Sequence, residues 1–218
     1  MKKLAVMAAV FMAIIGGSAN AVPTLQLFIA GGAYDNLTDT WVTHSSTFDL
    51  YVIGANDILR NVMVSMALDL PHSTNPNGTA GIGVNGTLYN HWTYGTPNLL
   101  PPHDIYPAWY TEFNAGNYGF VGRVGDVNDG YDPSNGYLHH GHTWGQYRRF
   151  HITLDGTDFS HFDAFLYTYG CNHRTRIEFA PFSHDAESSG GGTVPEPGTM
   201  ALFGLGSLGM GIIRKIRK

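Results

Sequence analysis

Apolar and polar residues alternate along much of the chain. In TLQLFIAG, the residues Leu25, Leu27 and Ile29 fall on one side of an extended backbone and Gln26 falls on the other. A period of two residues is typical of strands with one buried face. The same pattern recurs in STFDLYVIG (46–54), NVMVSMALDL (61–70), RFHITL (149–154), HFDAFLYTY (161–169) and RIEFAPF (176–182).

Turn-forming pairs such as Asn85-Gly86 and Asp155-Gly156 separate these stretches. Between residues 22 and 193 we find no convincing amphipathic helix. The pattern therefore predicts an all-β domain, an antiparallel β-sandwich of jelly-roll type. Residues 91–145 are rich in Tyr, Trp, His, Pro and Gly with weak periodicity, and we expect them to form long ordered loops.

The two ends of the chain follow a different pattern. Lys2 and Lys3 precede a 12-residue apolar run from Leu4 to Ile15, and Ala19-Asn20-Ala21 follows. This order indicates a secretory signal peptide cleaved after Ala21, with Ala19 and Ala21 forming the A-x-A site. A helix of this length spans only about 18 Å, too short for a bilayer core of about 30 Å.

The C-terminal end combines three features. Val194-Pro195-Glu196-Pro197 is stiffened by its prolines, and the 14 residues from Met200 to Ile213 carry no charge. Four basic residues then close the chain and would stay on the cytoplasmic side of a membrane (Arg214, Lys215, Arg217, Lys218). Before this segment, the Gly/Ser-rich residues 186–193 predict a flexible linker.

These three features resemble the PEP-CTERM sorting signal of Gram-negative bacteria. The matching residues are Val194 to Thr199, the run MALFGLGSLGMGII and the tail RKIRK. The resemblance implies recognition by an exosortase-type membrane protease, a transient stay in the inner membrane, and release or attachment at the cell surface, often alongside exopolysaccharide. It gives four expected segments: signal peptide 1–21, β domain 22–187, linker 188–193, and sorting signal 194–218 with a short transmembrane helix.

Charge narrows the choice of partners. Residues 22–193 contain no lysine and six arginines against sixteen acidic residues, a net charge of −10. Nucleic-acid binding needs clustered Lys and Arg, so we expect no nucleic-acid partner. Cys171 is the only cysteine, which excludes an internal disulfide and favours a small buried side chain.

The body also resembles the choice-of-anchor N family. The stretches that carry this resemblance are residues 23–54, SHFDAFLYTYG (160–170) and FAPFSHDAE (179–187). Members of that family share an extracytoplasmic body and differ in the C-terminal anchor. The family brings no assigned activity.

Two groups of residues are candidates for metal binding. In GDVNDGYDPSNG, the oxygen-bearing residues Asp126, Asn128, Asp129 and Asp132 could bind calcium, or they could simply initiate turns, because the EF-hand spacing is not met. In LHHGHTW, the imidazoles of His139, His140 and His142 could bind a transition metal, although the spacing implies no third ligand on one face.

No catalytic motif such as G-x-S-x-G or H-E-x-x-H occurs. The aromatic cluster could stack on sugar rings or could pack long loops over the sheets (Trp92, Tyr94, Tyr106, Trp109, Tyr110). We therefore expect a secreted surface or matrix protein without enzymatic activity and without an obligatory cofactor, associated with exopolysaccharide or biofilm. A polysaccharide hydrolase or a lectin-like module is the alternative. Two carboxylates about 5–9.5 Å apart in a cleft would favour the hydrolase.

Overall fold

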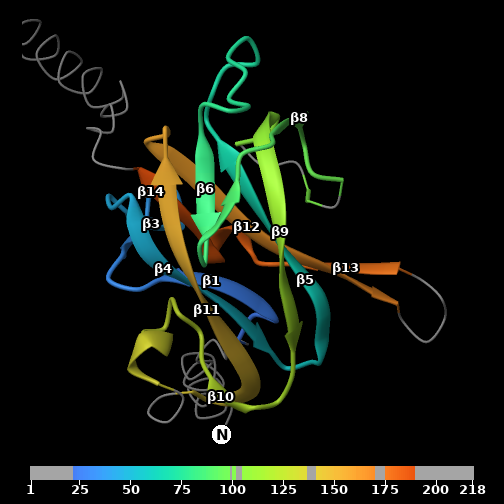
Figure 1. Ribbon diagram of the computed structural model, residues 1–218. Helices are drawn as coiled ribbons and strands as arrows, with labels where there is room; N and C mark the ends of the chain where they lie inside the picture. The colour runs from blue at the N-terminus through green and yellow to red at the C-terminus, as the bar shows by residue number, and fades with distance from the viewer. Residues whose placement is uncertain (1–21, 99, 102–104, 137–140, 170–174, 190–218) are drawn as a thin grey trace, which may run out of the picture.

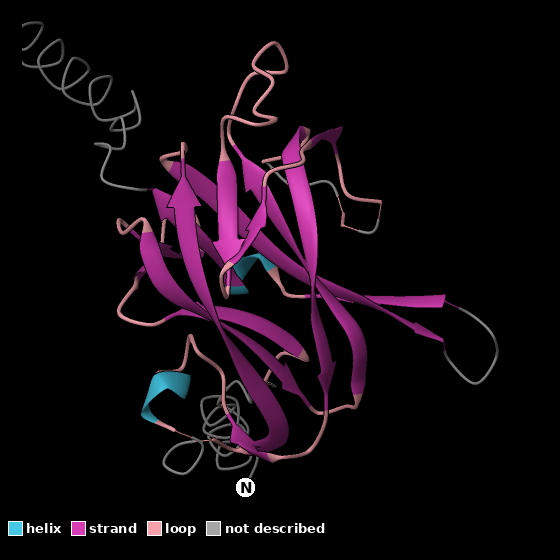
Figure 2. Cartoon of the chain, viewed as in Figure 1, coloured by secondary structure: helices cyan, strands magenta, loops and turns pink. Residues whose placement is uncertain are grey.

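The computed structural model describes residues 22–98, 100–101, 105–136, 141–169 and 175–189 (Figure 1). Within these ranges nearly all regular structure is strand, and the helical turns drawn in Figure 2 are the short 3₁₀ segments Pro133–Asn135 and Phe182–His184. The all-β class predicted from the alternating pattern is confirmed.

The strands of the described residues form two sheets. The first has six antiparallel strands in the order β1-β4-β11-β6-β7, with β10 also paired to β11. Their bounds are β1 (Leu25–Ile29), β4 (Thr47–Ala55), β6 (Gly81–Val84), β7 (Thr87–Tyr89), β10 (Gly122–Val124) and β11 (Thr143–Asp155). The expected Asn85-Gly86 turn joins β6 to β7, and both of its residues have positive φ, as a tight hairpin turn requires.

The second sheet has eight strands in the order β2-β3-β14-β12-β5-β9-β8, with β13 on β12. The pair β3–β14 is parallel and the other pairs are antiparallel. The bounds are β2 (Ala33–Asp35), β3 (Thr40–Thr43), β5 (Leu59–Leu68), β8 (Thr93–Gly95), β9 (Ala108–Tyr118), β12 (Phe159–Tyr169), β13 (Thr175–Phe179) and β14 (Asp185–Ser189).

The hydrophobic core lies between the two sheets. It takes the apolar side of β1, β4 and β5 that the alternation predicted, together with β12 residues such as Phe162, Ala164 and Leu166. The rings of Phe48 and Phe162 meet across the core edge to face, with centroids 5.8 Å apart. Burial of these alternating residues between the two facing sheets stabilises the sandwich.

The outer side of β1 and β4 departs from the prediction. Gln26, expected on an exposed face, is 0% exposed, because the segment after β10 folds over this face. Its amide donates to the carbonyl of Gly125 at 3.1 Å and accepts from the N–H of Val127 at 3.0 Å. A second apolar cluster forms beside it (Phe28, Tyr51, Ile53, Ala55, Val124, Val127, Tyr131).

Two further expectations are corrected. Residues 91–145 are not only loops, because β9 crosses the second sheet between β5 and β8. Its alternation is broken by Gly116, whose φ is +95°, and by an irregular register against Leu59 and Val62. Residues 186–189 are not a linker either, since they belong to β14 and pair with both β12 and β3.

The predictions at the two ends of the chain fall outside the described residues. These are the signal peptide with Ala19 and Ala21, the remainder of the linker from residue 190, the motif Val194 to Pro197 and the apolar run 200–213. In the part of the chain that the structure describes, no helix has the length and apolar character to cross a membrane.

Candidate functional site

A polar cluster lies on the outer face of the second sheet, where β14, β12 and β5 run side by side. Successive residues of a strand point to opposite faces, so the core positions Phe162 and Ala164 leave His161 and Asp163 on the outer face. The register places His161 opposite Glu187 of β14, and Asp163 opposite Ser65 of β5. Asp185 shares the face of Glu187, because Ala186 between them lies in the core.

The side chains of this cluster converge on the imidazole of His161. Its Nε2 lies 3.4 Å from Oδ1 of Asp163 and 3.9 Å from Oδ2 of Asp185, and its Nδ1 lies 3.8 Å from Oε2 of Glu187. His161, Asp163 and Asp185 are 3%, 2% and 1% exposed. Three carboxylates therefore surround one imidazole in a site from which water is largely excluded.

A chain of hydroxyl groups extends the cluster. The hydroxyl of Tyr106 donates to Oδ2 of Asp163 at 2.7 Å and lies 3.0 Å from Oγ of Ser65. Burial, and then the charge of Asp163, raise the pKa of Tyr106, so this phenol stays protonated and serves as a fixed donor. The bond fixes the orientation of Asp163 and turns its other oxygen towards His161.

The electrostatics of the cluster favour bound positive charge. Burial alone would lower the pKa of His161, but Asp163, Glu187 and Asp185 raise it to about 10. Burial and then the neighbouring charge of Asp163 raise the pKa of Asp185, although His161 opposes this shift. Either protons or another cation must therefore offset the crowded carboxylates.

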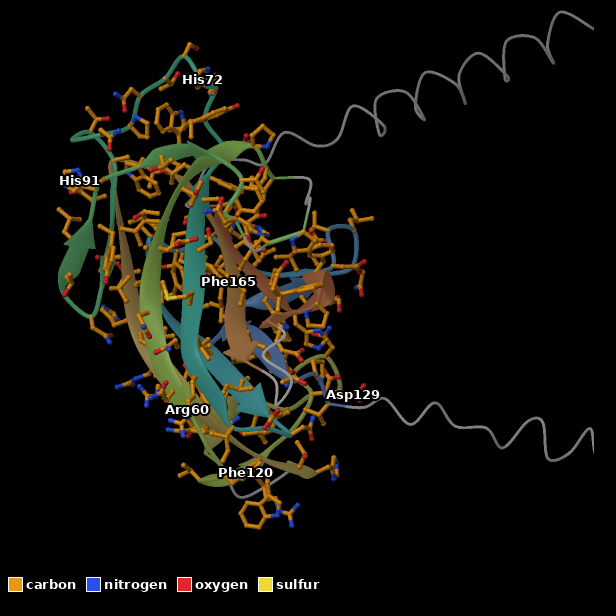
Figure 3. All side chains as sticks on the ribbon, turned by 90° about the vertical axis from the view of Figure 1, so that its right-hand side faces the viewer. Arg60, His72, His91, Phe120, Asp129 and Phe165 are labelled. Carbon is orange, nitrogen blue, oxygen red and sulfur yellow. The ribbon has the colours of Figure 1, made fainter. Side chains whose placement is uncertain are left out.

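The predicted calcium loop lies elsewhere, between β10 and the turn Pro133–Asn135. Oδ1 of Asp126 accepts from the backbone N–H of Asn128 at 2.8 Å and lies 2.9 Å from Nε2 of His184. Asp132 caps the following turn through Ser134 at 2.8 Å, and Asn128 accepts from Trp41 at 3.0 Å. These contacts match the turn-forming alternative, while calcium binding stays a prediction; Asp129, labelled in Figure 3, is exposed.

The other residues that the sequence singled out lie in several different places. Of the histidine group, His142 is exposed, and His139 and His140 lie outside the described residues, as does Cys171. Trp92 and Trp109 are buried in the core, which matches the packing alternative for the aromatic cluster. Tyr106 belongs to the polar cluster instead.

A second candidate, which we call the aromatic end, lies where β10 pairs with the first residues of β11. Trp144 is 50% exposed, Phe120 is 51% exposed and Val121 is 64% exposed. The guanidinium of Arg123 lies 4.4 Å from the centroid of the Trp144 ring. Asn56, Phe120, Thr143 and Trp144 line an open hollow of about 510 Å³, within the range of small-ligand sites.

The comparisons with known proteins bear on the end of the chain. Residues 193–218 match the PEP-CTERM protein-sorting motif. No curated protein is similar enough to the chain to count as a match. The motif implies export, processing by an exosortase-type membrane enzyme, and a cell-surface or extracellular location in a Gram-negative bacterium. The resemblance of the body to the choice-of-anchor N family gains no support from these comparisons.

Sequence reasoning did not find either site. The H-x-D pair of His161 and Asp163 was visible, because residues two apart on a strand share a face. Asp185 and Tyr106 reach the same place only through strand pairing and a long connection, which no local pattern shows. Trp144 follows Thr143 in the sequence. Its exposure could not be predicted, because exposure depends on which part of the sheet other segments cover.

Proposed function

We propose that this protein is a non-enzymatic surface or extracellular-matrix protein whose β body binds exopolysaccharide through the aromatic end. The sorting motif supports the location at the cell surface or outside the cell. The observation that carries the binding role is the half-exposed indole of Trp144 beside Phe120, Asn56 and Thr143. An association with biofilm matrix follows from such binding at a cell surface.

The chemistry of the aromatic end suits a sugar chain. Sugar rings have apolar C–H faces that stack on aromatic rings, and Trp offers the largest such surface. Around the hollow, the hydroxyl of Thr143 and the amide of Asn56 provide polar groups and bond to each other at 2.6 Å. Arg123 adds N–H donors for hydroxyl or carboxylate groups of a polysaccharide.

The location of the aromatic end also fits this role. Trp144 lies near the start of β11, and Leu154 lies ten residues later, up to about 33 Å along the strand. Leu154 and Ser188 both bond to the Ser45–Ser46 segment, so β14 reaches the opposite end of the body. The last described strand, β14, therefore ends away from the aromatic end, where β10 and Phe120 lie (Figures 1 and 3).

Burial of the carboxylates supports the non-enzymatic reading. Asp163 and Asp185 are the converging acids of the polar cluster, and they are only 2% and 1% exposed. The acids of a glycosidase must flank the scissile bond of a bound sugar. A polysaccharide chain would not reach this pair without a rearrangement of the sheet face.

The test is affinity electrophoresis of the full chain through gels that contain exopolysaccharide. Binding should retard the wild-type protein, and Trp144→Ala should weaken binding by about tenfold or more, because truncation of a Trp hot spot costs about 2 kcal/mol or more and about 1.4 kcal/mol is a tenfold change in affinity. Phe120→Ala should weaken it as well. Phe182→Ala removes an aromatic ring that is 39% exposed at a different place, so it serves as the matched control and should leave retardation unchanged.

Equal retardation of wild type and Trp144→Ala would refute the assigned contact. Release of new reducing ends from the polysaccharide by the wild-type protein would favour the hydrolase instead. In that case Asp163→Asn should abolish the release.

A further inference from the structure

We infer that His161, Asp163 and Asp185 form a binding site for one divalent transition-metal ion of the zinc type. The ion would be held by Nε2 of His161 and by one carboxylate oxygen from each aspartate. This inference does not depend on the sugar contact, because the two sites lie on different parts of the body.

The distances fit a metal centre. One ligand atom from each of the three residues lies within 4.8 Å of the other two. In a tetrahedral site with bonds of about 2.1 Å, neighbouring ligand atoms are about 3.4 Å apart. Nε2 of His161 is 3.4 Å from Oδ1 of Asp163 and 3.9 Å from Oδ2 of Asp185, so both distances from the imidazole are within about 0.5 Å of this spacing.

The surroundings resemble the outer shell of a metal site. A histidine ligand usually directs its second ring nitrogen at a carboxylate, a backbone carbonyl or a water molecule, which fixes the ring and strengthens it as a ligand. Nδ1 of His161 faces Oε2 of Glu187 at 3.8 Å. Asp163 is held in place by the hydroxyl of Tyr106 at 2.7 Å through the oxygen that does not face His161. Glu187 thus orients His161, and Tyr106 orients Asp163.

The charge of the buried carboxylates also supports a bound metal ion. Asp163 and Asp185 lie side by side in the protein interior together with Glu187, whose side chain is only 20% exposed. Like charges in a buried site are costly unless a cation offsets them. A divalent ion would offset both aspartates at once and would keep the bonds to Tyr106 and Glu187.

The donor set selects the kind of ion. One imidazole with two carboxylates suits zinc or a similar first-row metal, whereas calcium takes six to eight oxygen ligands. Three protein donors leave a fourth position for a water molecule or for the second oxygen of an aspartate. The ligands come from β12 and β14, so the ion would tie the last described strand to its neighbour in the sheet.

The experiment measures metal binding by the full chain after treatment with a chelator. Zinc content by mass spectrometry, with zinc titration by calorimetry, should give about one ion per chain. Cobalt used in place of zinc should give visible absorption bands from the bound ion. Asp185→Asn and Asp163→Asn keep the side-chain shape and should abolish stoichiometric binding, while Glu187→Gln should weaken it by about 10–100-fold.

Two control variants separate this site from others. Oδ1 of Asp49 lies 3.0 Å from Nδ1 of His151, and among the described residues no third potential ligand joins this pair. The Asp49→Asn variant should therefore bind zinc as the wild type does. His142→Ala tests the histidine-rich segment and should also have no effect. The inference is overturned if wild type binds no zinc, or if binding survives both aspartate substitutions. If those two variants fail to fold, an unchanged affinity of Glu187→Gln overturns it as well.

Discussion

Gln26 gives the sharpest test of the fold, because the alternation predicts an exposed side chain and the structure buries it completely. The Gln26→Ala substitution would remove two hydrogen bonds, to Gly125 at 3.1 Å and from Val127 at 3.0 Å. Each bond contributes about 0.5–1.5 kcal/mol, and the backbone groups left behind would be buried without these partners. We expect a loss of about 2–4 kcal/mol in the free energy of unfolding.

Urea denaturation measures this loss. With a slope of about 2 kcal/mol per molar urea, the midpoint should fall by about 1–2 M. Gln146→Ala is the matched control, because Gln146 makes one hydrogen bond to the N–H of Gly119, at 3.0 Å, in a partly buried position. It should cost no more than about 1 kcal/mol. A change of less than about 0.5 kcal/mol for Gln26→Ala would be typical of a surface site and would refute the burial of this face.

The remaining predictions concern the core, one carboxylate, the calcium loop and the sorting motif. Phe162→Ala should destabilise the fold by about 3–5 kcal/mol in the same assay, because the ring is fully buried against Phe48; a loss below about 1 kcal/mol would contradict this packing. Burial raises the pKa of Glu112, so the folded state binds its proton more tightly than the unfolded state does, and stability should rise as the pH falls through that raised pKa. Glu112→Gln should therefore raise the urea midpoint near neutral pH and leave it unchanged near about pH 3, whereas an equal shift at both pH values would argue against the titration. Addition of millimolar calcium should shift the melting temperature by less than about 2 °C, because Asp126 and Asp132 already accept hydrogen bonds within their turns; a larger shift would show that the loop binds calcium. Replacement of Pro195, Glu196 and Pro197 by alanine should leave unprocessed protein in the inner membrane, and unchanged release of that variant would count against exosortase processing.

The alternating pattern predicted the class of fold because each recognised strand buries one apolar face. Leu25, Leu27 and Ile29 lie in the core for that reason. The pattern could not show that a loop covers the opposite face, and so Gln26 was assigned to solvent. Nor could it show β14 (Asp185–Ser189), because four of its five side chains are polar and three of these become buried only through pairing with β12 and β3.

The candidate sites were less predictable than the fold. The polar cluster joins residues more than 50 positions apart, such as Tyr106 and Asp163, and only the register of β5, β12 and β14 brings its members together. The aromatic end depends on the exposure of Phe120 and Trp144, which follows from how β10 pairs with the start of β11. In contrast, the sorting motif is a contiguous segment, and its order of Pro-Glu-Pro, apolar run and basic tail is readable without a structure.

The most direct test of the account is the intact mass of the protein recovered from the cell surface and the surrounding medium. We predict a chain that begins at Val22 and lacks the basic tail from Arg214 to Lys218, because both ends would be removed during export and sorting. Recovery of the protein outside the cell with Arg214 to Lys218 still attached would contradict processing at the sorting motif. Retention of the whole chain in the cytoplasm would contradict the account altogether.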